Sequence, residues 1–270
     1  MFSKLKLIFK LFFLSITLFF NVMVIYVVLF LNAEKRFSLA ESMQGTYFSD
    51  KLFEILSIQN PNDSYVYRER SVAYNKRGMF NEGFKLLNTA VKLNQKEHLG
   101  YRGWMKLYKL KDYDGAIHDF ETLIKISPDI IKIMPGEDVY YLLAISYQGK
   151  NNLKKSKYYF EKYFNNRKQK EYIPQIAYVN YGVLLICMKD YNHSYIMLDK
   201  SLKVNQYQYA ESYYYKGIYY ERVKKTDSAL INYKKALIQY DKGYREKDVY
   251  NEVFNELYRE DILERKAKLN

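Results

Sequence analysis

The sequence predicts an all-α protein in which helix–turn–helix units stack into a solenoid, preceded by one transmembrane helix. Three observations lead to this prediction. A small residue recurs five times at intervals of 33 to 40 residues, each time with bulky side chains at fixed offsets. Glycine and proline are scarce, with 11 and 4 in 270 residues, which disfavours a loop-rich β fold. A run of uncharged residues near the N-terminus has the length of a membrane span.

The N-terminal run is predicted to be a membrane anchor. Residues 11–31 carry no charge, and at about 1.5 Å per residue such a helix crosses the roughly 30 Å hydrocarbon core of a bilayer. Three lysines precede the run, whereas the charges directly after it nearly cancel. By the positive-inside rule, residues 1–10 form a cytoplasmic basic tip and the repeats face the periplasm or cell exterior. A cleaved signal peptide is the alternative, although its apolar run is usually shorter and Leu31 is not the small residue that cleavage favours.

Residues 37–61 are expected to form a partial leading helix pair, with a helix ending at Asn60 and Pro61. Five repeats follow over residues 62–243. The small residues of their second helices are Gly83, Ala116, Ser156, Ser194 and Ala229. Bulky residues stand four positions later, at Leu87, Phe120, Phe160, Leu198 and Tyr233, and nine positions earlier, at Tyr74, Leu107, Tyr147, Leu185 and Tyr220. A further column, 12 positions earlier, holds Ser71, Trp104, Ala144, Gly182 and Gly217. Small residues let the helices approach, and bulky ones fill the space between neighbouring units.

These columns resemble the tetratricopeptide repeat, most closely in DYDGAIHDFETLIKISPD with Ala116, Phe120 and Pro128. The resemblance covers about two thirds of the chain and implies a right-handed superhelix whose first helices line a concave groove for peptides. The units are expected at residues 62–96, 97–130, 137–170, 171–208 and 209–243. The second unit is one residue out of step when aligned on Gly103, and Ile131 to Gly136 are inserted before the third.

The C-terminal residues 244–270 are predicted to form one capping helix. Its apolar stripe would contain Val249, Tyr250, Val253, Phe254, Leu257 and Tyr258. A solenoid needs a terminal helix that is apolar inside and polar outside.

The family geometry places candidate binding residues on the first helix of each unit. They are Arg68, Val72, Asn75 and Lys76 in the first unit, Tyr141, Ile145 and Gln148 in the third, Val179, Val183 and Ile186 in the fourth, and Tyr214, Ile218 and Glu221 in the fifth. Aromatic and aliphatic positions flanked by polar groups suit a partner helix or peptide. The alternative for each position is that it packs inside the solenoid. Asn75 and Lys76 alone do not form a clamp for a C-terminal carboxylate.

No catalytic, metal or cofactor site is predicted. The three histidines are scattered, and Cys187 is the only cysteine, expected to be a buried, inert thiol among apolar neighbours. Asp112 and Asp114 fall in a turn and are explained by turn chemistry. The sequence has no glycine-rich phosphate loop and no serine elbow, so an enzyme or a small-molecule substrate is not expected.

The expected function is a non-catalytic, membrane-tethered scaffold that binds a protein or peptide segment, in a bacterial envelope assembly. The chain has 43 basic and 30 acidic residues, a net charge of +13. One alternative is therefore an anionic envelope polymer or lipid surface bound by lysine-rich turns: Lys106, Lys109 and Lys111, or Arg167, Lys168 and Lys170. Solvated surface is the simpler explanation of these clusters, because each lies in a repeat turn or connector. A cytoplasm-facing regulatory adaptor is a second alternative, and nucleic acid is not expected as a partner.

Overall fold

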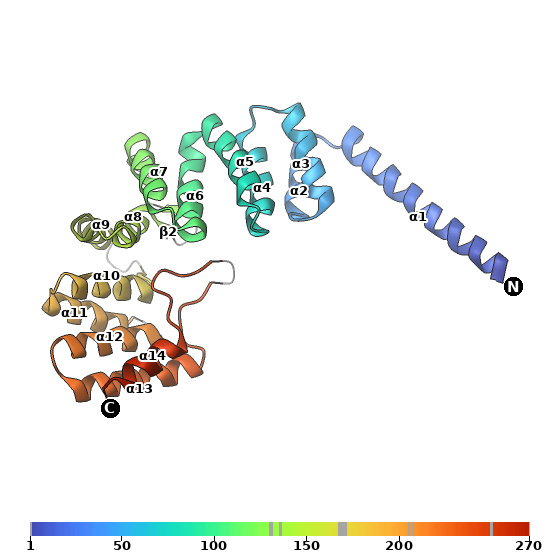
Figure 1. The fold of residues 1–270 in the computed structure, drawn as a ribbon. Helices are drawn as coiled ribbons and strands as arrows, with labels where there is room; N and C mark the ends of the chain where they lie inside the picture. The colour runs from blue at the N-terminus through green and yellow to red at the C-terminus, as the bar shows by residue number, and fades with distance from the viewer. Residues whose placement is uncertain are drawn as a thin grey trace. The chain divides into compact units, whose positions relative to one another are not determined.

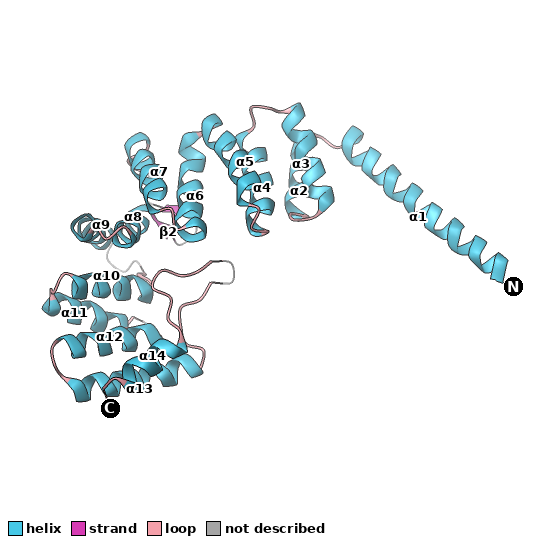
Figure 2. Ribbon diagram, viewed as in Figure 1, coloured by secondary structure: helices cyan, strands magenta, loops and turns pink. Residues whose placement is uncertain are grey.

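The computed structural model describes residues 2–129, 132–134, 137–166, 172–204, 206, 208–248 and 251–269. These residues are mostly helical, with two short strands (Figure 2). The chain divides into two compact units, Met1–His98 (unit 1) and Leu99–Asn270 (unit 2), each of which is described separately.

Unit 1 begins with a long apolar helix followed by two helix pairs (Figure 1). The helices are α1 (Phe2–Phe30), α2 (Ala33–Ser42), α3 (Tyr47–Gln59), α4 (Ser64–Lys76) and α5 (Phe80–Leu93), and the unit boundary falls within α6 (Gln95–Met105). Asn32, Thr46 and Asp63 begin α2, α3 and α4, each accepting a hydrogen bond from a backbone N–H of the first turn. Such side chains satisfy amides that a helix start leaves without a partner.

Helix α1 contains the apolar segment predicted from the sequence. Its residues Phe9–Phe30 are long and apolar enough to cross a membrane by length and composition. The segment ends one residue before the predicted Leu31, which lies in a bend, because Asn32 already begins α2. Val27, near the end of α1, is 5% exposed and packs in a cluster with Leu52 and Phe53 of α3.

The leading pair is complete, not partial. Helices α2 and α3 pack against one another from Ala33 onward, and Ser49 Oγ donates to the Ala40 carbonyl at 2.6 Å. The expectation of an incomplete unit at residues 37–61 is therefore wrong. Residues 33–36 repeat no column of the later units, so the pattern did not reveal that they are helical.

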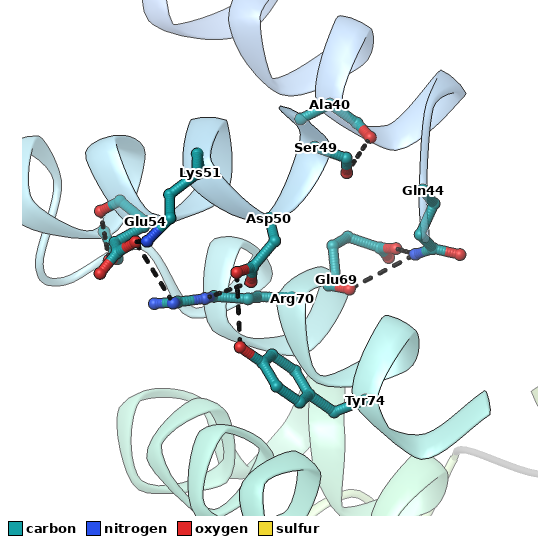
Figure 3. Close-up of polar contacts among 10 residues, drawn as sticks. Ala40, Gln44, Ser49, Asp50, Lys51, Glu54, Glu69, Arg70 and Tyr74 are labelled. Atoms are coloured by element: carbon teal, nitrogen blue, oxygen red, sulfur yellow. Dashed lines mark hydrogen bonds and ion pairs between the residues drawn. The ribbon is translucent and has the colours of Figure 1, made fainter. Parts of the chain in front are cut away.

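Polar side chains hold α3 on α4 (Figure 3). Arg70 Nε donates to Asp50 Oδ1 at 3.0 Å, and its guanidinium lies 3.8 Å from Glu54. The Tyr74 hydroxyl lies 3.4 Å from the other Asp50 oxygen. Both Asp50 and Arg70 are only 16% exposed as side chains, so water screens this pair less than a surface pair.

Unit 2 contains the remaining repeats. After α6 come a π-helical turn, η1 (Lys106–Leu110), α7 (Tyr113–Ile126), α8 (Val139–Gly149), α9 (Leu153–Asn165), α10 (Gln175–Cys187), α11 (Tyr191–Ser201), α12 (Ala210–Arg222), α13 (Thr226–Asp241) and α14 (Arg259–Ala267). Between α7 and α8, strands β1 (Lys132–Met134) and β2 (Glu137–Asp138) pair antiparallel, with Lys132 opposite Asp138. The insertion Ile131 to Gly136 thus contributes β1, while Ile131, Pro135 and Gly136 lie outside the described residues.

Two of the predicted columns lie wholly in the interior of the repeats. All five small residues and all five bulky residues that follow them are buried. A Cβ atom at Gly182 would lie 2.8 Å from the Leu198 side chain, and one at Gly217 would lie 2.5 Å from the Tyr233 ring. Where the small residue is serine, its hydroxyl donates to the first helix, as Ser194 does to the Gly182 carbonyl at 2.9 Å. The α-solenoid of stacked helix pairs is confirmed.

The irregular register of the second repeat has a local cause. Gly103, not Trp104, occupies the small position, since a Cβ atom at Gly103 would lie 2.6 Å from Phe120. The π-helical turn η1 then adds one residue before α7, a way in which helices absorb a single insertion. The predicted placement of Trp104 in this column is therefore wrong. Trp104 is instead partly buried and packs against the central hydrophobic cluster of unit 2.

The C-terminal region differs from the predicted capping helix. Helix α14 spans only Arg259–Ala267, and the described residues between 244 and 258 are not helical. Asn255 has a left-handed backbone with φ of 58°, which ends any helical path there. Val249 and Tyr250 lie outside the described residues. Residues 244–248 and 251–258 are called the C-terminal strap below.

Candidate binding face of unit 2

The candidate residues of unit 1 do not form an open binding surface. Asn75 is 3% exposed and lies against Gly83, where a Cβ atom would collide with its amide. Val72 is buried, Arg68 is half-buried beside Glu69, and Lys76 is exposed and contacts Gln44 at 3.2 Å. The prediction that Asn75 lines a groove is wrong. The reason is that glycine in α5 brings the two helices together at this position.

The candidates of unit 2 divide into covered and partly accessible positions. Ile145 and Val179 have no exposed surface, and Ile186 is 7% exposed, so these predictions are wrong. Gln148, Val183, Ile218 and Glu221 are half-buried. The prediction for Ile145 failed because helix α8 is apolar and buried on all sides. Helical spacing therefore could not distinguish a side that lines a groove from a side that packs in the core.

Two predicted tyrosines contact other parts of unit 2. Tyr141 is 9% exposed, and its hydroxyl accepts a 2.8 Å hydrogen bond from Asn180 Nδ2. Tyr214 is 8% exposed, packs with Tyr233 and Ile262, and lies beside Arg265 of α14. Helix α14 therefore covers the fifth-unit position, whereas Tyr141 borders a cavity.

The cavity has a volume of about 170 Å³ and lies between the first helices and the strap. We call this side of α6, η1, α8, α10 and α12 the first-helix face. Its aromatic lining residues are Trp104, Tyr108, Tyr141, Tyr163 and Phe254. Trp104 Nε1 and Asn251 Oδ1 are buried there without a hydrogen-bond partner among the described residues. The helices thus contribute aromatic walls and one free donor, Trp104 Nε1, whereas Phe254 and the free acceptor Asn251 Oδ1 belong to the strap. Aromatic walls with a free donor suit a ligand that has both apolar and polar groups.

The strap passes beside α10, where Asn255 contacts Asn180 (Figure 1). Asn255 Nδ2 donates to Asn180 Oδ1 at 2.9 Å, and the Asn255 carbonyl lies 3.5 Å from the Tyr215 hydroxyl. Phe254 packs against the central cluster, and Glu252 lies 3.4 Å from Lys111. The sequence prediction missed Asn180. The available signal was a single amide inside the apolar run AYVNYGVLL, because a buried amide needs a partner.

Two carboxyl groups lie where the strap begins. The Glu246 N–H donates to Glu211 Oε1 at 3.1 Å, and the Ala210 N–H donates to the Tyr244 carbonyl at 2.8 Å. Burial raises the pKa of Glu211 to about 7, against the smaller opposite effect of the backbone hydrogen bonds it accepts. Burial and the nearby charge of Asp248 raise the pKa of Glu246 to about 7. The carboxyl groups of this junction therefore titrate near neutral pH.

The described residues contain no group of three or more His, Cys, Asp or Glu side chains placed to hold a metal ion. Cys187 is exposed, so the expectation of a buried thiol is wrong: as the last residue of α10 it lies on the solvent side of the helix. Asp112 begins α7 and accepts from the Gly115 N–H at 2.9 Å, which agrees with its predicted turn role.

The lysine-rich turns are partly neutralised. Lys106 lies 2.8 Å from the fully buried carboxylate of Asp119, which Arg102 also contacts at 2.7 Å. Lys111 lies beside Glu252. The other proposed cluster, Arg167, Lys168 and Lys170, lies outside the described residues.

No protein-family model matches the sequence, and no curated protein is similar to it in sequence. Solved structures are similar in fold. A tetratricopeptide repeat protein from Parabacteroides merdae is 17% identical, with a TM-score of 0.55 over 89% of this chain and 85% of its own. PilW, a type IV pilus biogenesis factor, is 12% identical, with a TM-score of 0.62 over 79% of this chain and 95% of its own. YrrB, with an unusual peptide-binding site, is 15% identical, with a TM-score of 0.54 over 69% of this chain and 91% of its own. The chain therefore has the fold of tetratricopeptide repeat proteins.

Proposed function

We propose that this protein is a non-catalytic scaffold that α1 tethers to a membrane and that binds an extended protein segment on the first-helix face of unit 2. The aromatic-walled cavity with its free Trp104 donor carries the proposal. Aromatic side chains dominate binding energy at protein interfaces, and a free indole N–H can receive a backbone carbonyl. The fold shared with YrrB, a protein with a peptide-binding site, supports the same class of ligand.

Retention of α1 is part of the proposal. Val27 packs against α3, and Leu31 contacts the same cluster, so removal of α1 would expose apolar surface on the leading pair. The lysines before the span favour a cytoplasmic N-terminus, with the repeats on the outer side of a bacterial-type inner membrane. Protease added to spheroplasts should digest the repeats, and carbonate washing should leave the intact chain in the membrane. Protection of the repeats would reverse the orientation, and a mature N-terminus near Glu34 would show a cleaved signal.

Photo-cross-linking in the living host tests the binding face. A benzoylphenylalanine placed at Tyr108 should cross-link a partner, whereas one at Ile231, which is 52% exposed on α13, should not. Trp104→Ala should reduce the Tyr108 cross-link severalfold, and 0.5 M salt should not, because apolar burial is not screened by ions. Cross-links only from Ile231, or a product that salt abolishes, would favour the anionic-surface alternative.

A further inference from the structure

We propose that the middle of the C-terminal strap, residues 251–255, is a displaceable occupant of the first-helix face, and that the partner segment is an extended peptide whose aromatic and amide side chains replace Phe254 and Asn255. This inference rests on the proposed function of the face and adds both the chemistry of its ligand and the means of its control.

The strap makes the contacts that an extended ligand would make. Its described residues are not helical, and Phe254 and Asn255 contact the face from adjacent positions. Asn180 has no exposed surface, lies in an apolar helix, and receives its hydrogen bond from Asn255, 75 residues later. Tyr141 accepts from the other end of the same amide and so fixes its orientation. An unbonded amide at this position would be costly, so the face needs an occupant that brings a donor to Asn180.

The two ends of the strap are held more firmly than its middle. At one end, the Tyr244 carbonyl and the Glu246 N–H bond to α12. At the other end, Leu257 is 2% exposed and packs with Ile262 in the C-terminal cluster. Both anchors can therefore persist while residues 251–255 leave the face.

The middle of the strap fits the face imperfectly. The ion pair of Glu252 with Lys111 is exposed, and the Tyr215 contact with Asn255 is at the limit of hydrogen bonding. A cavity of about 170 Å³ remains beneath it, with Trp104 Nε1 and Asn251 Oδ1 lacking partners among the described residues. A segment that only completed a core would fill this space and satisfy these groups. A peptide that fills the cavity and accepts a hydrogen bond from Trp104 Nε1 would displace the middle of the strap.

A labelled peptide with the sequence of residues 244–258 is the probe. We expect it to bind the full chain in detergent micelles weakly, because the strap already occupies the face. The variant Phe254→Ala/Asn255→Ala, which releases the strap, should bind the probe about tenfold more tightly, since affinity rises with the fraction of open protein. Fluorescence anisotropy measures both. Ile231→Ala on the outer side of α13 is the matched control and should bind as the unaltered protein does.

Two further measurements keep the result interpretable. A probe carrying the same two alanines should lose its affinity for the opened variant. Hydrogen exchange should show faster exchange at residues 251–255 when unlabelled probe is added to the unaltered protein, with α12 unchanged. Equal affinities of the two proteins, or no binding with strap exchange as slow as that of α12, would overturn the inference and make the strap a permanent part of the fold. If the Tyr108 cross-link persists in that case, the proposed function stands and only the strap inference fails. If the cross-link is also missing, the proposed function fails too.

Discussion

Units 1 and 2 stack the same kind of helix pair with different chemistry. In unit 1, α3 and α4 meet through a partly exposed polar group, in which Asp50 meets Arg70 and Tyr74, beside the apolar contact of Val66 with α3 (Figure 3). In unit 2, α9 and α10 of successive pairs meet through two rings with little or no exposed surface, Phe160 and Tyr181, at 4.9 Å. Repeat spacing therefore specifies where the helices meet but not which kind of side-chain contact joins them. The first-helix face of unit 2 is also lined by rings, those of Trp104, Tyr108 and Tyr141.

The largest expected losses of stability come from truncating a buried core side chain in each unit. Phe160→Ala should lower the free energy of unfolding of unit 2 by about 3–5 kcal/mol, because Phe160 has no exposed surface. The single tryptophan of the chain, Trp104, belongs to unit 2, so urea unfolding followed by its fluorescence reports on that unit. Leu87→Ala in unit 1 should cost about 2–5 kcal/mol but appear mainly in the helical circular dichroism. If Leu87→Ala shifts the fluorescence transition by the full amount, the units unfold as one.

The next largest losses of stability should come from removing a carboxylate that pairs with a cation in each unit. Asp119 has no exposed surface and pairs with both Arg102 and Lys106, so Asp119→Ala removes the buried carboxylate that both cations contact. We expect a loss of about 3 kcal/mol, near the range for breaking buried pairs. Asp50→Ala in unit 1 should cost about 1 kcal/mol, because its pair with Arg70 is partly solvated. Equal losses in thermal denaturation would contradict this contrast in burial.

Acidification should affect the two units in opposite directions. Burial raises the pKa of Glu211 to about 7, above its ordinary 4.5, so the folded state binds the proton more tightly. The contribution of protonated Glu211 to the stability of unit 2 is fully present below about pH 4.5. It is lost as the pH rises through 7, a change in the free energy of unfolding of at most about 3 kcal/mol. Burial lowers the pKa of His98 in unit 1, so unit 1 instead loses stability as the pH falls below 6.5.

Unfolding followed separately by Trp104 fluorescence and circular dichroism at pH 5.5 and 8 tests this opposition. Glu211→Gln should raise the stability of unit 2 at pH 8 and flatten its dependence on pH, while His98→Gln should flatten that of unit 1. Glu246 and Arg245 also influence Glu211, and Asp248 influences Glu246. Glu246→Gln is the matched control and should give a smaller change, because Glu246 is only half-buried. A unit 2 that is more stable at pH 8 than at pH 5.5 would contradict the assignment.

The smallest effect concerns the helix-pair contact itself. Ser194→Ala removes the hydrogen bond to the Gly182 carbonyl and should cost about 1 kcal/mol or less. Alanine already occupies this column at Ala116 and Ala229, so the cavity created is small. The matched change in unit 1, Gly83→Ala, should cost more, because its new Cβ atom would collide with Asn75. Denaturant midpoints of the two variants give the comparison.

The repeat architecture could be predicted from the sequence because it depends on short-range spacing. The small and bulky columns recur at helical intervals, and each is satisfied within one pair or between neighbouring pairs. The apolar length of α1 and the cap at Asp112 are likewise local properties. In the second repeat, the one-residue shift at Gly103 was visible in the sequence, but its cause, the π-helical turn η1, was not.

Only the tertiary structure decided which first-helix residues are accessible and what covers them. Ile145 and Val179 have the spacing of groove residues and yet no exposed surface, because burial depends on neighbours far away in the sequence. The stripe of Phe254 and Leu257 has helical spacing, but these residues pack from a non-helical strap. The bond between Asn255 and Asn180 joins positions 75 apart. Periodicity records the local backbone preference, and a long-range contact of this kind outweighs that preference without leaving a trace in the spacing.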